Sequence, residues 1–142
     1  MMDYNTNMKN INWYPGHMKK TRELIEENLK MVDLVIEVVD ARIPVSSRNP
    51  IIDDLIKGKR RVIALNKSDL ADSRASEQWI KHFKGEGYDA LAMDCAKGSG
   101  VNQMFKLLTA IQEEKDKERM RKKPLRMMIV GVPNVGKSSL IN

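Results

Sequence analysis

The sequence predicts an α/β fold in which helices cover both faces of a doubly wound parallel sheet. Four short apolar runs, "LVIEVVD", "RVIALN", "ALAMD" and "RMMIVG", are continuous rather than alternating, as in strands buried on both faces of a parallel sheet. Segments that can form helices separate these runs, which predicts right-handed crossover connections. Each run also ends in polar or glycine-rich residues, at the edge where parallel strands hold ligands.

The expected elements alternate along the chain. Helices are expected at residues 17–31, 50–57, 75–84 and 101–117, and strands at residues 34–40, 61–66, 90–94 and 126–131. The last helix has the clearest pattern, because apolar residues recur at helical spacing from Val101 to Ile111, and Pro124 then breaks the run. Residues 1–12 are expected to form a flexible N-terminus.

Composition limits the environment of the protein. The 142 residues suit one domain, and no run of 18 apolar residues is present, so no membrane span is expected. The opening "MMDYNTNMKN" lacks the apolar core of a secretion signal, and the lone Cys95 cannot form an internal disulfide, so a cytoplasmic location is expected. A net charge of +6 favours an anionic partner but does not distinguish nucleic acid from a merely basic surface.

The stretch "GVPNVGKSSLIN" at residues 131–142 has the pattern G-x-x-x-x-G-K-[ST] of a phosphate-binding loop. Its glycines allow backbone N–H groups to converge on phosphate oxygens. Lys137 would reach the β- and γ-phosphates, and the Ser138 hydroxyl would coordinate Mg²⁺. A chance turn is the simpler alternative. The residues predicted to bind nucleotide here are Asn134, Val135, Gly136, Lys137, Ser138 and Ser139.

The tetrapeptide "NKSD", from Asn66 through Lys67 and Ser68 to Asp69, predicts a guanine base. The Asp69 carboxylate can accept two hydrogen bonds from guanine, whereas adenine offers no such pair of donors, so a buried Asp69 would reject it. Asn66 would tie this loop to the phosphate loop, and the stem of Lys67 would cover one face of the base. A polar turn leading into a helix is the alternative.

A further loop, "DCAKGSG", follows the third expected strand and is similar to the S-A-K loop of guanine-nucleotide proteins. This similarity implies that the backbone N–H of Ala96 meets the guanine oxygen and that Lys97 packs beside the base. Cys95 stands where serine is commoner, and it is included in the predicted site; a small buried hydrophobe is the simpler reading of Cys95 alone.

The order base loop, second base loop, phosphate loop is the reverse of that in Ras-like GTPases. With "WYPGHM" and "DARIPVSSRNP", these motifs resemble, in sequence order, the circularly permuted P-loop GTPases of the RbgA/YlqF ribosome-biogenesis type. The resemblance implies a G domain over residues 13–142 and the spatial strand order fourth–first–second–third. The family's switch threonine, D-x-x-G loop and C-terminal RNA-binding domain are not in this sequence. We therefore expect the N-terminal part of a longer protein, truncated after the phosphate loop, with weak guanine-nucleotide binding, poor hydrolysis, and its fourth strand as an uncovered apolar edge.

The resemblance also implies a GTPase acting in large ribosomal subunit assembly, with guanine nucleotide, the large subunit and rRNA as partners and GTP and Mg²⁺ as cofactors. Lys137 and His17 are the implied catalytic residues, His17 positioning water; a surface histidine is the alternative. Asn134 leaves K⁺ open as a further cofactor, against a simple turn residue. Two rival functions stay open at this point, an ATP-using P-loop enzyme and a non-enzymatic RNA-binding assembly module.

Two further segments have only general interpretations. Asp40 and Arg42 in "DARIPVSSRNP" could lie near the phosphates or at a ribosome-facing surface, with Arg42 and Arg48 as possible RNA contacts, or the segment could be a plain strand-to-helix connection. The basic run at residues 115–126 is interpreted as a solvated, salt-bridged helix face in preference to an RNA clamp, because acids are interleaved with its lysines.

Overall fold

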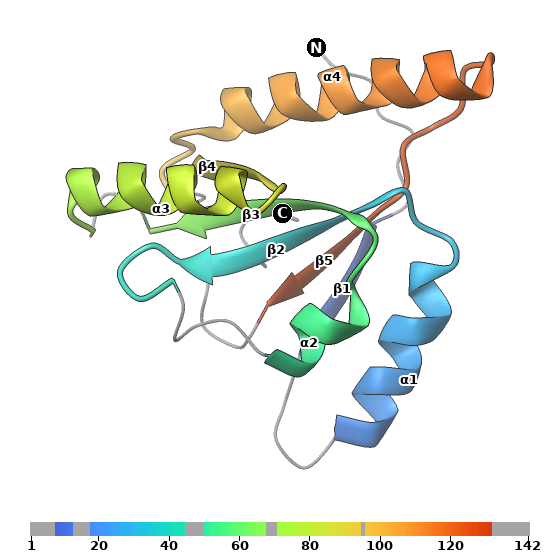
Figure 1. The fold of residues 1–142 in the computed structure, drawn as a ribbon, viewed down its shortest axis with the longest axis horizontal. Helices are drawn as coiled ribbons and strands as arrows, with labels where there is room; N and C mark the ends of the chain where they lie inside the picture. The colour runs from blue at the N-terminus through green and yellow to red at the C-terminus, as the bar shows by residue number, and fades with distance from the viewer. Residues whose placement is uncertain (1–7, 13–17, 45–49, 68–70, 95, 132–142) are drawn as a thin grey trace.

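The computed structural model describes residues 8–12, 18–44, 50–67, 71–94 and 96–131. Strands and helices alternate along the chain (Figure 1), which confirms the α/β class. The elements are β1 (Met8–Asn12), α1 (Met18–Leu29), β2 (Leu34–Asp40), α2 (Pro50–Leu55), β3 (Arg60–Asn66), α3 (Ser73–Gly85), β4 (Asp89–Ala92), α4 (Val101–Arg119) and β5 (Met127–Gly131).

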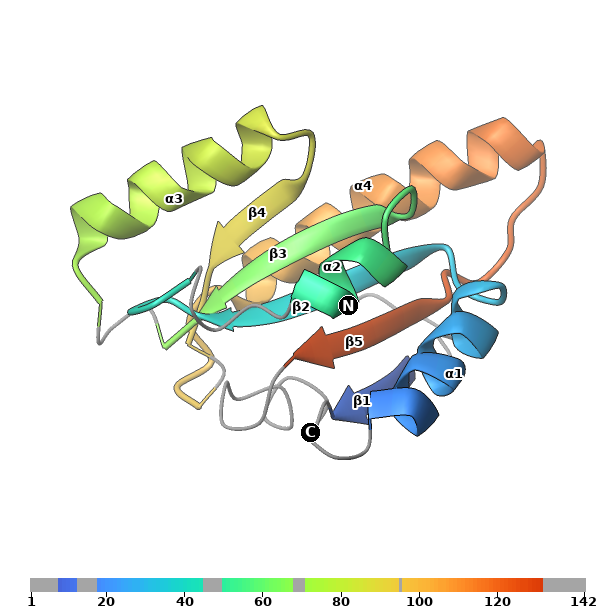
Figure 2. The ribbon, with the colours of Figure 1, turned by 60° about the horizontal axis from the view of Figure 1, so that its bottom comes forward.

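The sheet has the strand order β1-β5-β2-β3-β4, and every pair of neighbours is parallel (Figure 2). The predicted order of the four expected strands is therefore confirmed, with β5 beside β2. The longest register joins β2 to β3, from Leu34 opposite Arg60 to Asp40 opposite Asn66. These two strands end at the same level of the sheet, which brings the residues that follow them together.

The first strand corrects two expectations. Residues 8–12 are not a flexible terminus but form β1, which pairs with β5 from Met8 opposite Met127 to Asn12 opposite Gly131. The outer edge of β5 is accordingly covered rather than open. The sequence "MKNIN" contains only two apolar residues, too few to show a strand pattern. Backbone hydrogen bonding to β5 therefore decides its conformation, a tertiary effect that local sequence does not encode.

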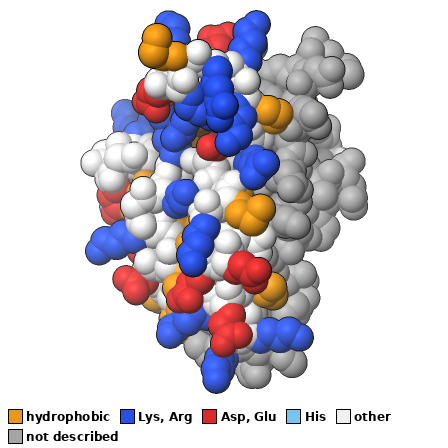
Figure 3. All heavy atoms as spheres, turned by 90° about the vertical axis from the view of Figure 1, so that its right-hand side faces the viewer, with side chains coloured by type: hydrophobic (Ala, Val, Ile, Leu, Met, Phe, Trp, Pro, Cys, Tyr) orange, Lys and Arg blue, Asp and Glu red, His pale blue; other side chains and the backbone are white. Residues whose placement is uncertain are grey.

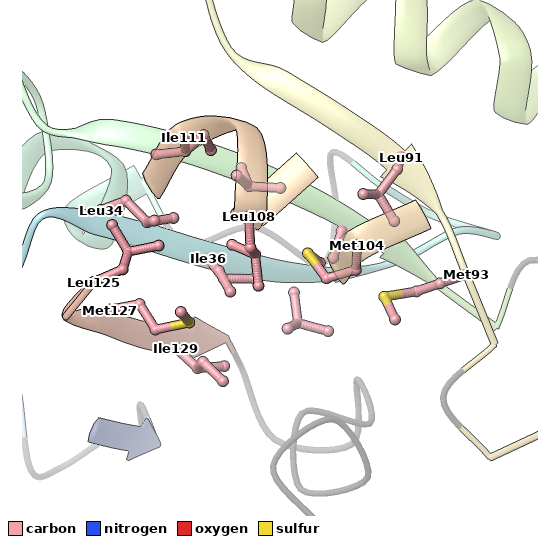
Figure 4. Close-up of a cluster of buried hydrophobic side chains, with 13 residues drawn as sticks. Leu34, Ile36, Leu91, Met93, Met104, Leu108, Ile111, Leu125, Met127 and Ile129 are labelled. Atoms are coloured by element: carbon pink, nitrogen blue, oxygen red, sulfur yellow. The ribbon is translucent and has the colours of Figure 1, made fainter. Parts of the chain in front are cut away.

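Residues of β2 alternate between the two faces of the sheet, and both faces are covered. Leu34 and Ile36 point toward α4, whose Leu108 and Ile111 fill the same cluster (Figure 4). Val35 instead contributes to a cluster with α1 and α2, and Val39 to one with α3. All seven residues of β2 are buried, as expected for a central strand of a doubly wound sheet. Figure 1 shows α4 on one side of the sheet and α1 and α2 on the other.

A buried ion cluster separates the two apolar clusters on the face covered by α1, α2 and α3. The Arg61 guanidinium lies 3.6 Å from Glu37 Oε1 and is hydrogen-bonded to Asp53 of α2. Its Cζ atom also lies 4.4 Å from the centre of the Tyr88 ring. Because Arg61 and Glu37 are each only 3% exposed, their charges stabilise the fold only through such partners. The cluster fixes α2 against the sheet.

Helix ends differ from the predicted ends by a few residues. The helix expected at residues 50–57 ends at Leu55, and that expected at residues 101–117 continues to Arg119. Met120 then adopts a left-handed conformation and caps α4, with its N–H bonded to carbonyl oxygens of the last turn. Among the described residues, every helix is too short or too polar to cross a bilayer.

Candidate nucleotide-binding site

The carboxyl ends of the parallel strands gather the predicted nucleotide loops at one edge of the sheet. The strand β3 ends at Asn66, the first residue of "NKSD", and β5 ends at Gly131, the first residue of the phosphate-loop motif. Only β2 lies between them. Adjacent strands are about 4.8 Å apart, so the two strand ends are about 10 Å apart, within the length of an extended nucleoside triphosphate. The third loop follows β4 at the same edge (Figure 2).

Four predicted site residues lie within the described structure: Asn66, Lys67, Ala96 and Lys97. The others lie outside the described residues: His17, Ser68, Asp69, Cys95, Asn134, Val135, Gly136, Lys137, Ser138 and Ser139. Their roles therefore stay predictions, as does the binding of one nucleotide by both Asp69 and Lys137.

Asn66 and Lys67 form the transition from β3 into the predicted base loop. Asn66 is 3% exposed, and its carbonyl oxygen accepts a hydrogen bond of 2.7 Å from the N–H of Ala41. Lys67 has a φ of 61°, in the left-handed region that non-glycine residues seldom adopt. This conformation ends the extended backbone of β3 at the residue immediately before Ser68 and Asp69.

The buried carboxylate of Asp40 connects the end of β2 to that loop. Arg42 donates three hydrogen bonds to it: from its backbone N–H and its Nε to Oδ1, both 2.9 Å, and from Nη2 to Oδ2, 2.6 Å. The Nζ atom of Lys67 lies 3.8 Å from Oδ2. The Arg42 hydrogen bonds hold the pKa of Asp40 below its ordinary value, and the same contact raises the pKa of Arg42.

These contacts give the "DAR" segment a defined local structure, while the expectation that Asp40 and Arg42 lie near the phosphates stays a prediction. Asp40 and Arg42 form a turn in which the aspartate side chain accepts from the backbone two residues on, as such turns commonly do. The turn is also joined to the base loop through the ammonium group of Lys67, which is only 3.8 Å from the carboxylate. Asp40 therefore joins the end of β2 to the first residue after β3, a contact that the sequence did not predict.

A second buried aspartate, Asp94, organises the loop that follows β4. Its Oδ1 accepts hydrogen bonds from the N–H groups of Ala96, at 3.1 Å, and Lys97, at 3.3 Å. The Asp94 N–H donates to the carbonyl of Ser99 at 2.8 Å, which closes the loop. The Ala96 N–H predicted to meet guanine thus has an internal acceptor in this structure. Its contact with the base stays a prediction that requires this bond to be shared or released.

Gly100 ends this loop and caps α4 at a point where the backbones nearly touch. Its φ is +80°, and a Cβ added there would lie 2.6 Å from the carbonyl oxygen of Ala92 and 2.8 Å from the Cβ of Met93. Only glycine meets both conditions without displacement of the neighbouring backbone. In the sequence, the indication of this requirement is the glycine that separates "DCAKGS" from the apolar stripe of α4.

Known proteins are similar to this chain over most of its length. No family model matches the chain. The chain is 51% identical to ribosome biogenesis GTPase A of Priestia megaterium over 138 residues, which is 93% of this chain and 48% of that protein. It is 39% identical to mitochondrial ribosome-associated GTPase 1 of Bos taurus, over 92% of this chain and 40% of that protein. The chain spans about half the length of the curated relatives it matches.

Among solved structures, the crystal structure of GNP-bound YlqF from T. maritima superposes with a TM-score of 0.62 at 31% identity. The match covers 87% of this chain and 46% of that one. Within this chain, β5 lies beside β2 although it follows β2 by three strands in the sequence, which is the strand order that the resemblance implied. Over the length that aligns, this chain is therefore similar in sequence and in fold to ribosome biogenesis GTPase A and to YlqF.

Proposed function

We propose that the protein containing this chain binds and hydrolyses GTP and acts in assembly of the large ribosomal subunit in the cytoplasm. Support for the ribosomal role comes from the names of the relatives, a ribosome biogenesis GTPase and a mitochondrial ribosome-associated GTPase. Support for the nucleotide comes from the chain itself, through the motifs that follow β3, β4 and β5. Residues 13–142 would then be the base-reading half and phosphate loop of a G domain.

One observation carries the proposal furthest: β3 and β5 end at the same edge of the sheet with β2 alone between them. Asp69 follows the end of β3 by three residues, and Lys137 follows the end of β5 by six. Both loops therefore start within reach of one nucleotide. Asp69 would accept the ring and exocyclic N–H groups of guanine, while Lys137 would contact the terminal phosphates.

In this proposal GTP hydrolysis transfers the γ-phosphoryl group to water. The Ser138 hydroxyl would hold Mg²⁺, which would supply charge stabilisation, and Lys137 would add to it. The backbone of residues 134–139 would surround the phosphates, while Ser68, Cys95 and Lys97 would complete the surroundings of the base. His17 would orient the attacking water, and Asn134 would help to bind K⁺.

Base recognition is tested by equilibrium binding of GDP, ADP and XDP to this chain. Wild type should prefer GDP. Asp69→Asn should weaken GDP binding by about 10- to 150-fold, the loss of hydrogen bonds to a charged group, and strengthen XDP binding, because xanthine has an acceptor where guanine has an amine. Asp72→Asn is the matched control. Asp72 caps α3 by accepting from the Arg74 N–H, so its change should leave nucleotide affinity unaltered.

Equal affinity of the wild type for ADP and GDP would refute the guanine assignment and favour an ATP-using enzyme. Unchanged GDP affinity in Asp69→Asn would also refute the guanine assignment. The catalytic assignment is tested separately, in the full-length protein, by His17→Ala. We expect turnover to fall while GTP affinity is retained, and equal loss of both would show a structural role for His17. Turnover in K⁺ compared with Na⁺ tests Asn134.

A further inference from the structure

The net positive charge of this protein is concentrated at the edge of the sheet opposite the nucleotide site. Three segments precede the starts of β2, β3 and β5: residues 30–34, 57–60 and 119–126, which we call the amino-end surface. They contain nine of the chain's 25 Lys and Arg residues but one of its 19 Asp and Glu residues, so the rest of the chain has a net charge of −2. The nine are Lys30, Lys57, Lys59, Arg60, Arg119, Arg121, Lys122, Lys123 and Arg126.

Specific contacts join the three segments into one surface. The N–H of Asp33 donates to the carbonyl of Arg126 at 2.7 Å, and the N–H of Arg126 donates back to Asp33 Oδ2 at 3.0 Å. The Nζ of Lys59 donates to the carbonyl of Val32 at 2.8 Å, which adds the second segment. The Nη2 of Arg119 lies 3.8 Å from the same Asp33 oxygen. Far-apart parts of the sequence thus form a fixed basic surface.

Acids on the last turns of α4 do not neutralise this surface. When residues 112–118 are included, with their two lysines and four acids, the net charge is still +6, equal to that of the whole chain. Two of these acids have internal partners. Glu114 accepts from Arg60 at 2.9 Å, and Asp116 accepts from the backbone N–H of Lys123 at 3.1 Å. The Asp116 bond shapes the loop that carries the basic residues.

Arg121 and Lys122 are two available charges of the amino-end surface. Both are exposed, and within the described part of the chain neither forms an ion pair. The left-handed cap at Met120, whose side chain is 91% exposed, ends α4 and turns these residues outward. In Figure 3, which faces this side of the molecule, Lys and Arg side chains gather at the upper end of the described surface.

We infer that the amino-end surface binds the phosphate backbone of double-stranded RNA, an inference that rests on the proposed ribosomal function. The three segments contain no aromatic residue, so they offer no platform on which unpaired bases could stack. Lysine and arginine on a rigid scaffold suit phosphate contacts to a duplex, which are independent of base sequence and sensitive to salt. Because β3, β4 and β5 end at the opposite edge of the sheet, RNA and nucleotide would be bound together without competition.

The test uses this chain and a fluorescein-labelled RNA duplex of about 20 base pairs, a little longer than the about 16 that a double-stranded RNA-binding domain spans. Anisotropy titrations between about 50 and 200 mM KCl give the dissociation constant and its salt dependence. We compare wild type with the triple variant Arg121→Gln, Lys122→Gln, Lys123→Gln. The control triple variant, Lys81→Gln, Lys84→Gln, Lys106→Gln, removes the same charge from exposed positions on α3 and α4.

The first variant should bind RNA at least about tenfold more weakly, and the slope of log K against log salt should fall by about 2, because up to three phosphate contacts are lost. The control should change affinity less than about twofold, since it removes only diffuse charge. Equal weakening in both variants would overturn the inference, as would the absence of salt-dependent RNA binding by wild type.

Two parallel measurements separate this inference from its rivals. In these measurements the RNA is replaced by vesicles that contain phosphatidylserine and, separately, by a poly-glutamate peptide. If the first variant lost binding to either probe while its RNA binding stayed unchanged, the RNA assignment would be overturned. GDP affinity of the same variant should equal that of wild type. A wild-type chain that binds RNA as described but does not prefer GDP would refute the nucleotide proposal and leave the RNA surface supported.

Discussion

Replacement of Gly100 by alanine should destabilise the protein through two separable effects. The first is backbone strain: at φ +80°, an L-residue costs about 1–2 kcal/mol relative to the right-handed region, offset by about 0.4–1 kcal/mol from the smaller entropy of the unfolded chain. The second is a steric clash, because the new Cβ would lie 2.6 Å from the Ala92 carbonyl oxygen and 2.8 Å from the Met93 Cβ.

The clash cannot be relieved cheaply, since Ala92 is the last residue of β4 and its oxygen belongs to the backbone. The N–H of Met93 also donates to the carbonyl of Leu65 at 2.8 Å, so a shift of this segment strains its pairing to β3. Forced displacements of this kind typically cost about 1–3 kcal/mol. The Gly100→Ala variant should therefore lose about 2–4 kcal/mol in the free energy of unfolding.

Gly98→Ala is the matched control. Gly98 has nearly the same backbone angle, φ +77°, but nothing lies within 4 Å of its added Cβ, so only the strain effect of about 1 kcal/mol remains. Equilibrium unfolding in urea measures both variants, with the change in midpoint multiplied by the shared m-value. Equal destabilisation of the two variants would refute the steric argument and leave backbone strain as the whole effect.

Two further predictions concern the site and the core. Asp40→Asn should destabilise the chain by about 1 kcal/mol at pH 7, because Arg42 and Lys67 lose a charged acceptor. The pKa of Asp40 is lowered in the fold, so the stability that its charge contributes is complete above the ordinary pKa of 3.8 and disappears as the pH falls through the lower folded pKa. Urea unfolding should therefore show that the difference in unfolding free energy between wild type and Asp40→Asn narrows below about pH 4. A difference that stays constant with pH would contradict this. Leu108→Ala should cost about 2–5 kcal/mol, because Leu108 is 2% exposed in the cluster beneath α4, whereas Phe105→Ala on the same helix, at 45% exposure, should cost less than half as much. Thermal unfolding ranks the pair, and the reverse order would show that α4 packs differently.

The central strands were predictable because burial on both faces leaves a direct record in sequence. The run at residues 34–40 is apolar except for Glu37 and its terminal aspartate, and it became β2 with the same bounds. Its neighbour β3 differs by one residue from the predicted range. β1 left no such record. The five residues of β1 form a strand because they pair with the edge of β5, whose residues follow them by more than a hundred positions in the sequence.

In the candidate site, the sequence predicted which polar residues stand at the strand ends but not how those residues are oriented. Asn66 lies at the end of β3 as expected. The left-handed conformation of Lys67 and its approach to Asp40 depend on tertiary placement, which no local pattern of "NKSD" encodes. The contacts of the basic run at residues 115–126 likewise depend on tertiary placement. It was interpreted from its own interleaved acids, whereas its surroundings are set by Asp33 and Lys59, which reach it only through the folded sheet.

The insertion of β5 between β1 and β2 has a consequence for synthesis on the ribosome. Translation at about 5–20 residues per second separates the emergence of β2 from that of β5 by roughly 5–20 s. Throughout that interval the β5-facing side of β2 and all of β1 lack the strand that later hydrogen-bonds to both. During synthesis, the nascent polypeptide therefore exposes an unpaired, apolar strand edge to solvent. We expect chaperones that bind such edges to associate with it before β5 completes the sheet.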